Sequence, residues 1–124
     1  MLSEAAELRA KETGIAAKDA LTLQAFENLE AQGWKPHSRL DGREVETVLE
    51  DVGLGEYVVY THIYENLETM FAKPSIYRLT VDQAFYDWLN SPGHRAAMLL
   101  PDIKYMGLGY DGTYNQHWAQ LFSE

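Results

Sequence analysis

The sequence predicts an α+β domain in which helices pack on a small antiparallel sheet. Apolar residues recur at helical spacing over residues 19–32. Residues 105–110 and 116–122 are typical of two strands, and the Asp111-Gly112 pair between them is a hairpin signal. A third strand is predicted at residues 57–62, where β-branched and aromatic side chains gather. Because three strands cannot cover both faces of their own sheet, the helices must pack on it.

The first part of the chain is predicted to be helical. Residues 3–13 are typical of a polar helix, with Ser3 as its N-cap and Gly14 as its end. The helix over residues 19–32 is the stronger one, and Gly33 ends it. Its apolar residues fall on one stripe: Leu21, Ala25, Phe26 and Leu29.

A loop and another helix follow. The loop covers residues 34–40 and carries His37. Asp41 and Glu44 have the spacing of a capping box, which predicts that a helix begins there, and Gly53 ends that helix. Its buried face consists of apolar residues at helical spacing: Val45, Val48, Leu49 and Val52.

The remaining helices are predicted from their caps. Residues 64–79 are ambiguous, and we expect mostly loop or a short helix there. Thr80 and Gln83 again have capping-box spacing. Ser91 and Pro92 then start a short helix as its N-cap and first residue. The helix after Thr80 has a core stripe: Val81, Ala84, Phe85, Trp88 and Leu89.

The two C-terminal strands contain glycines and aromatic residues. Residues 107–109, Gly-Leu-Gly, lie inside a strand, so we expect close packing there rather than phosphate binding. His117 and Trp118 alternate, and the tryptophan is expected on the inner face. Trp88, Trp118 and Phe122 are therefore predicted to be core residues.

Bulk properties place limits on the class of protein. The length of 124 residues, with 46% hydrophobic residues, predicts a single domain over residues 1–124 that can bury its own core. A formal net charge of −9 argues against binding to nucleic acid or anionic lipid. The absence of cysteine excludes disulfides, thiolate metal sites and a cysteine nucleophile. No apolar run approaches the roughly 20 residues of a transmembrane helix.

The first residues, Met1-Leu2-Ser3-Glu4, lack the basic and apolar regions of a signal peptide. We therefore expect either a cytoplasmic protein or a chain that begins after a removed leader or anchor.

His94 is the strongest single candidate for chemistry. It is the third residue of the helix predicted to begin after Ser91, close to free backbone N–H groups and the positive end of the helix dipole. This field disfavours an imidazolium and leaves a neutral ring that can accept a proton or bind a metal. The alternative is that His94 packs between helix and sheet and hydrogen-bonds a backbone carbonyl.

Two further candidates come from loops and strand ends. His37 lies in a loop ahead of a helix, where a histidine is commonly just solvated. Glu65 is expected just past a strand end beside Asn66, where it could instead cap the next segment. His62 has no metal-motif spacing to its neighbours and is taken as structural. The chain contains no G-x-S-x-G, H-E-x-x-H, P-loop or dinucleotide fingerprint.

Taken together, several short motifs resemble the CAP superfamily, also called SCP domains: cysteine-rich secretory proteins, antigen 5 and plant pathogenesis-related proteins. The chain is most similar to the short, cysteine-free bacterial branch. The motifs occur in the family's order over essentially the whole chain: His37 with Asp41-Gly42, Glu65-Asn66-Leu67, Trp88 with Ser91-Pro92-Gly93-His94-Arg95, Gly107-Leu108-Gly109, and Trp118-Ala119-Gln120-Leu121-Phe122.

The resemblance implies an α-β-α sandwich with a central antiparallel sheet of about three strands, and a cleft lined by two histidines and two acids. His37, His94 and Glu65 match three of these residues. Ser91 stands where the second acid is expected, and Tyr64 replaces the glycine that usually precedes the first. The cleft should therefore hold a divalent ion weakly, zinc being favoured by imidazole ligands.

The resemblance also implies a secreted or cell-envelope protein. The favoured function is a non-enzymatic module whose cleft binds a small molecule, a lipid, a peptide, a metal or another protein. The first alternative is a hydrolase, in which His37, His94 and Glu65 hold zinc and a water, or in which His94, oriented by Glu65, acts as a general base. The second alternative is a structural module of a longer protein.

Overall fold

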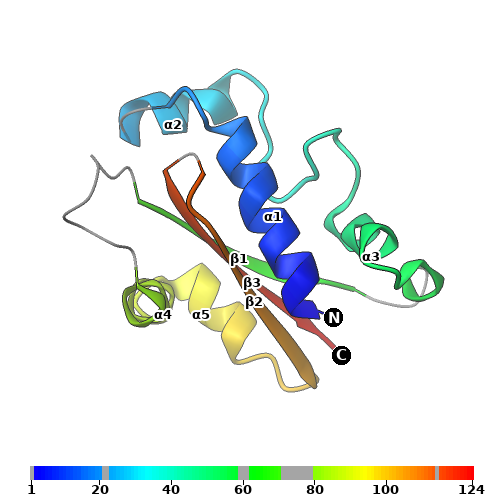
Figure 1. Ribbon diagram of the computed structural model, residues 1–124. Coiled ribbons are helices and arrows are strands. Elements are labelled where there is room, and N and C mark those ends of the chain that lie inside the picture. Colours follow the sequence, from blue (N-terminus) through cyan, green and yellow to red (C-terminus); the bar gives the residue numbers. More distant parts are fainter. Residues whose placement is uncertain (1, 21–22, 59–61, 71–79, 114) are drawn as a thin grey trace.

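The computed structural model describes residues 2–20, 23–58, 62–70, 80–113 and 115–124. Among them the helices are α1 (Leu2–Ala16), α2 (Leu23–Ala31), α3 (Val48–Asp51), α4 (Val81–Leu89) and α5 (Pro92–Met98). The strands are β1 (Tyr64–Met70), β2 (Tyr105–Asp111) and β3 (Gln116–Ser123). Short 3₁₀ turns cover Val45–Thr47 and Gly55–Tyr57. Helix α1 covers one face of the sheet, while α4 and α5 lie on the other (Figure 1).

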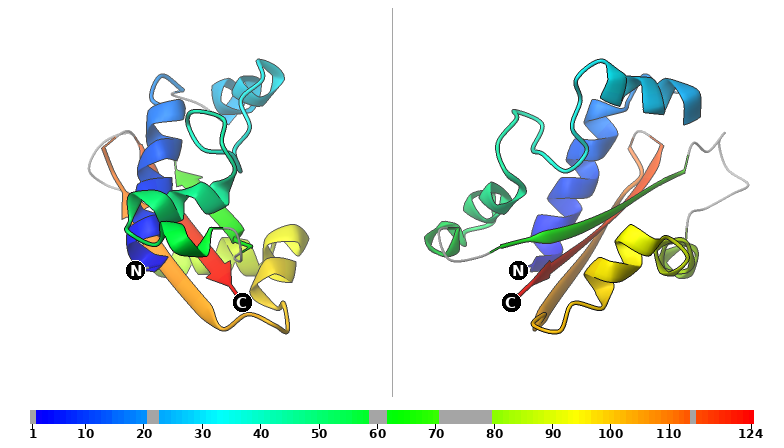
Figure 2. Two further views of the ribbon diagram at one scale, coloured as in Figure 1. Left: turned by 90° about the vertical axis from the view of Figure 1, so that its right-hand side faces the viewer. Right: turned by 180° about the vertical axis from the view of Figure 1, so that it is seen from behind.

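The described strands form one antiparallel sheet in the order β1-β3-β2, which confirms the predicted antiparallel sheet of about three strands. Tyr64 pairs with Phe122 at one end of β1, and Tyr105 pairs with Ser123 at the start of β2. The view from behind shows α5 lying over the face opposite α1 (Figure 2). The α-β-α arrangement and the hairpin of β2 and β3 are confirmed, and β1 is an edge strand of the described sheet.

Helix α1 packs directly on β2, and two glycines make this possible. A Cβ atom added to Gly107 would overlap the backbone of Leu2 and Ser3, and one added to Gly109 would overlap the backbone of Ala6 and Glu7. The prediction of close packing at this Gly-x-Gly pair is therefore confirmed.

The first helix differs from its prediction in both bounds and character. Ser3 lies inside α1 and is not its N-cap, and Gly14 is also helical. Gly14 does not end the helix; it lies against the ring of His117, whose Cδ2 would be 3.2 Å from an added Cβ. The helix is far from a polar surface helix: it buries Arg9 and Glu12 besides small residues. The charged residues of this helix suggest exposure to water, but Arg9 and Glu12 are buried because ion pairs within the fold take the place of water.

The strand predicted at Tyr57–His62 is wrong at the residues that the structure describes, 57, 58 and 62. Gly55–Tyr57 forms a 3₁₀ turn, and residues 59–61 lie outside the described residues. The strand begins at Tyr64 instead and occupies residues predicted as loop. Its polar residues become strand because β3 pairs along its whole length. Residues 71–79 of the same predicted loop lie outside the described residues.

The capping box predicted at Asp41 and Glu44 is also wrong. Glu44 occupies the N-cap position of the 3₁₀ turn but makes no side-chain cap. Asp41 instead accepts a hydrogen bond from the Arg43 backbone and pairs with its side chain. Nevertheless, Val45, Val48 and Leu49 are buried, Val52 packs against them, and Gly53 adopts the positive φ of a helix end.

The caps of the later helices are largely as predicted. Thr80 is the N-cap of α4, and its hydroxyl accepts from the backbone N–H of Gln83. Ser91 and Pro92 start α5, although the Ser91 hydroxyl does not cap it. Trp88 is fully buried, whereas Leu89 is exposed, so the apolar stripe of α4 is narrower than predicted.

On β3 both faces are largely buried, so the prediction that Trp118 rather than His117 faces inward is wrong. His117 is fully buried, and its Nδ1 lies 2.8 Å from the hydroxyl of Thr69. Trp118 is only partly buried and packs against the Tyr110 ring, with 5.0 Å between ring centroids. Phe122 is buried as predicted. The error arises because α1 covers the face of His117 tightly, and a hydrogen bond makes the imidazole acceptable there.

Candidate functional site

Both predicted histidines border one cavity of about 280 Å³ beside the edge strand β1. We call this cavity the cleft. It is formed by α1, α2, the loop before Arg39, β1 and α5, and its lining residues are Thr13, Phe26, Glu30, Pro36, His37, Leu67, Glu68, Thr69 and His94. The fold thus brings together side chains that are far apart in the sequence. Glu65 and Ser91 are outside this lining, and each contacts one of the two imidazoles.

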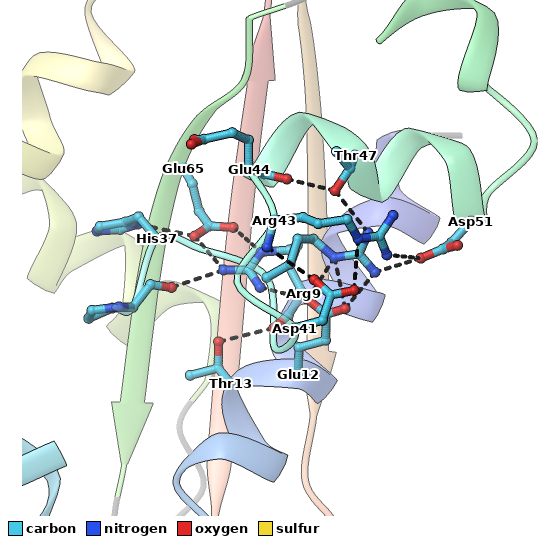
Figure 3. Close-up of polar contacts among 12 residues, drawn as sticks. Arg9, Glu12, Thr13, His37, Asp41, Arg43, Glu44, Thr47, Asp51 and Glu65 are labelled. Carbon is cyan, nitrogen blue, oxygen red and sulfur yellow. Dashed lines mark hydrogen bonds and ion pairs between the residues drawn. The ribbon is translucent and has the colours of Figure 1, made fainter. Parts of the chain in front are cut away.

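The buried carboxylate of Glu65 contacts the imidazole of His37. Its carboxylate oxygen Oε1 lies 3.0 Å from Nδ1 of His37. The Glu65 side chain is only 2% exposed, whereas that of His37 is 57% exposed. The Glu65 side chain points from β1 toward α1, where Arg9 meets it (Figure 3). Since a carboxylate only accepts hydrogen bonds, Nδ1 of His37 is the protonated nitrogen in this contact.

The Glu65 carboxyl is held ionised. Burial alone would raise its pKa, but hydrogen bonds from His37 and Arg9, together with the Arg9 charge, hold the pKa below its ordinary value. The Arg9 guanidinium donates from Nε to Oε2 at 2.6 Å and from Nη2 to Oε1 at 3.0 Å. Glu65 is therefore a fixed, charge-neutralised carboxylate rather than a free base.

His94 is positioned by contacts of its own. Its Nδ1 lies 2.9 Å from the Ser91 hydroxyl, one helical turn earlier. The side-chain amide of Asn66, on β1, donates to the His94 carbonyl at 3.1 Å and to Gln120 Oε1 at 3.0 Å. Burial and, secondarily, the nearby His37 lower the pKa of His94. His94 is therefore a neutral imidazole at physiological pH, as the sequence predicts.

A second acidic group, missed by the sequence reasoning, lines the cleft. Burial, then the charge of Asp87 and a hydrogen bond with it, raise the pKa of Glu68 to about 7. Glu68 lies on β1 and Asp87 on α4. The neighbouring Asp87 carboxyl makes ionisation of Glu68 more costly than burial alone would. The cleft thus contains a carboxyl group, Glu68, that titrates near neutral pH.

The pH dependence of stability tests this assignment. The folded pKa of Glu68, about 7, lies above its ordinary value of 4.5, so the native state holds a proton that the unfolded chain releases. The stabilisation is complete below the ordinary value and is lost as pH rises through about 7. Glu68→Gln should therefore be more stable than wild type at about pH 8, by on the order of 1 kcal/mol because solvent screens this half-exposed site.

Urea denaturation at several pH values measures the effect. Near pH 4 the variant and wild type should differ little, because Glu68 is protonated in both states. Glu30→Gln is the matched control, since Glu30 lines the same cleft but is exposed. Parallel stability curves for Glu68→Gln and wild type would contradict the raised pKa of Glu68.

The three residues expected to hold zinc do not form a ligand set in this arrangement. Among the residues that the structure describes, no group of three or more His, Asp or Glu side chains is placed to hold a metal ion. Both oxygens of Glu65 already accept hydrogen bonds from Arg9. A zinc ion would have to compete with the guanidinium for this carboxylate, and weak zinc binding at His37, His94 and Glu65 stays a prediction.

Other polar residues fall outside the cleft. His62, taken as structural, is an exposed side chain whose Nδ1 lies 3.0 Å from Glu46 Oε1. Arg9 was missed because a charged residue in a helix is normally expected to face water. One signal could have found it: Arg9 falls on the same helical stripe as the alanines Ala5, Ala6 and Ala10.

The comparisons agree with the motifs. A family model described as "CAP: Cysteine-rich secretory protein family" matches residues 3–122, which is nearly the whole chain. No curated protein and no solved structure gives a match. Within the described residues, no helix has the length and apolar character needed to cross a membrane. With the α-β-α arrangement and the family match over residues 3–122 both established, the chain belongs to the cysteine-rich secretory protein (CAP) family.

Proposed function

We propose that this chain is an extracellular, non-enzymatic binding domain whose cleft takes a small ligand or a short peptide segment. The observation that carries the proposal is the cleft of about 280 Å³, bordered by His37 and His94. Its volume is near the lower end of the range for ligand sites, which favours a small ligand. Membership in a family described as secretory supports the extracellular location.

The lining indicates what kind of ligand would fit. Phe26 and Leu67 supply apolar surface, while Thr69 and the two imidazoles supply hydrogen-bonding groups. Such a mixture suits a ligand with an apolar body and one polar end, because polar groups fix orientation while apolar contact supplies affinity.

Binding is favoured over hydrolysis by the state of the polar groups. Glu65 is tied to Arg9 and His37, so it is a poor general base for water. The Ser91 hydroxyl contacts Nδ1 of His94, three residues later in the chain. This is a local contact within the first turn of the helix. Among the described residues Glu65 contacts His37 and not His94, so this serine–histidine pair does not have Glu65 as the third group that orients the base of an activated nucleophile.

Screening with defined probes tests the proposal. Blocked dipeptides with aliphatic or aromatic side chains would be screened by saturation-transfer NMR, and Kd measured by calorimetry. His94→Ala is expected to weaken binding of a hit by about tenfold, the effect of losing one hydrogen bond in a partly buried site. His62→Ala is the matched control, because His62 is an exposed imidazole outside the cleft.

The same variants serve for Zn²⁺ as a probe. Weak zinc binding that disappears in His94→Ala and survives in His62→Ala would support the metal prediction. Equal affinities of wild type and His94→Ala for every probe would refute the cleft as the binding site. Turnover of an ester or peptide that depends on His94 would overturn the proposal and favour a hydrolase.

A further inference from the structure

We propose that Arg9 is the positioning residue of the cleft: from α1 it holds Glu65 and the Pro36 carbonyl, and so fixes the orientation and tautomer of His37. This inference deepens the proposed function and rests on it where ligand binding is concerned. No motif singled out Arg9. Its side chain is 1% exposed, so its role is internal to the fold.

The guanidinium makes contacts to three different parts of the chain. Nε and Nη2 donate to the two oxygens of Glu65 on β1, Nη1 donates to Glu12 at 2.7 Å, and Nη2 also donates to the Pro36 carbonyl at 2.9 Å. The planar fork of arginine can make all these contacts at once, whereas the single ammonium of lysine cannot. One side chain therefore ties α1, β1 and the loop together (Figure 3).

Arg9 controls His37 through two routes. The Pro36 carbonyl lies in the residue directly before His37, so its hydrogen bond to Nη2 anchors the backbone there. Glu65 Oε1 accepts a hydrogen bond from Arg9 Nη2 and lies 3.0 Å from His37 Nδ1, so Glu65 anchors the His37 side chain. Since the His37 side chain is 57% exposed, packing alone cannot orient it. The proton on Nδ1 leaves Nε2 as the acceptor available to a ligand.

The positive charge beside Glu65 is thus the Arg9 guanidinium, which belongs to the chain itself. A buried carboxylate needs a compensating charge, and Arg9 supplies it at the oxygens that a metal ligand would use. The orientation of His37 should therefore be independent of divalent cations, and the experiment is run with a chelator present.

Arg39 offers a matched control. It is also buried and also binds Glu12, from Nη2 to Oε1 at 2.6 Å, and it pairs with Asp51. Its recorded contacts do not include Glu65 or Pro36. Arg39→Lys should therefore perturb stability in the way that Arg9→Lys does, without the specific effect on His37.

Long-range ¹H–¹⁵N NMR spectra of the imidazole nitrogens measure the tautomer directly. Wild type should show His37 mainly as the Nδ1–H form. In Arg9→Lys the ratio of Nδ1–H to Nε2–H should fall by about tenfold, the effect of losing one hydrogen bond to a charged group. Arg39→Lys should leave the ratio unchanged. An unchanged ratio in folded Arg9→Lys, or an equal fall in both variants, would overturn the proposal.

Glu65→Gln provides the test if Arg9→Lys does not fold. The substitution keeps the size of the side chain and removes the charge that Arg9 holds, so the Nδ1–H form of His37 should again weaken. Retention of that form would overturn the route by which Arg9 acts on the His37 ring through Glu65. If the tautomer shifts in these variants while no probe binds wild type, the positioning role stands and the proposed binding function fails.

Discussion

Trp88→Ala is expected to lower the free energy of unfolding by about 3–5 kcal/mol, the usual cost of removing a large buried aromatic side chain. Trp88 lies in α4 and is fully buried, and its ring meets Phe85 edge-on, with 5.6 Å between ring centroids. Its indole Nε1 donates to the Leu67 carbonyl at 3.1 Å, so truncation also leaves a backbone acceptor of β1 without this donor.

Trp118→Ala is the matched control for this prediction. Part of the Trp118 ring is exposed to water, so its removal should cost less, about 1–2 kcal/mol. Guanidinium denaturation of both variants and wild type measures the difference. Equal losses, or a larger loss for Trp118→Ala, would contradict the placement of Trp88 in the core and of Trp118 at its edge.

Gly109→Ala is expected to destabilise the fold by about 3 kcal/mol or more, the upper part of the range for overpacking. The added methyl group would overlap the backbone of Ala6 and Glu7 in α1. Backbone atoms of a helix cannot turn aside as a side chain can, so α1 and β2 must separate. That separation would loosen the apolar contacts along the whole helix.

Gly93→Ala separates this clash from the general effect of replacing glycine. Gly93 lies in α5, and a Cβ there meets nothing within 4 Å. Alanine should therefore be neutral or stabilise the helix by up to about 1 kcal/mol. If the packing of α1 on β2 is correct, the melting temperature falls in Gly109→Ala and is unchanged or rises in Gly93→Ala. A melting temperature of Gly109→Ala at or above that of wild type would refute it.

The positions of the site histidines could be predicted, but the contact by which Arg9 holds Glu65 could not. Ser91 and Pro92 mark the start of α5, which places His94 in its first turn, and the loop carrying His37 follows from the Gly33 stop. The grouping of these histidines with Glu65 came from the order of motifs, not from periodicity. Arg9 is 56 residues from Glu65, and no local pattern records a partner at that distance.

The local sequence by itself determined the features that depend on interactions between neighbouring residues. The Thr80 cap, the Ser91-Pro92 helix start and the hairpin of β2 and β3 each depend on neighbouring residues, and each is observed. The tertiary structure alone decided the rest. Strand β1 forms from Glu- and Asn-containing sequence because β3 pairs with it, and His117 faces inward because Thr69 and Gly14 accommodate its ring. Burial of polar groups is favourable only where distant partners complete their hydrogen bonds, and those partners are fixed by the fold.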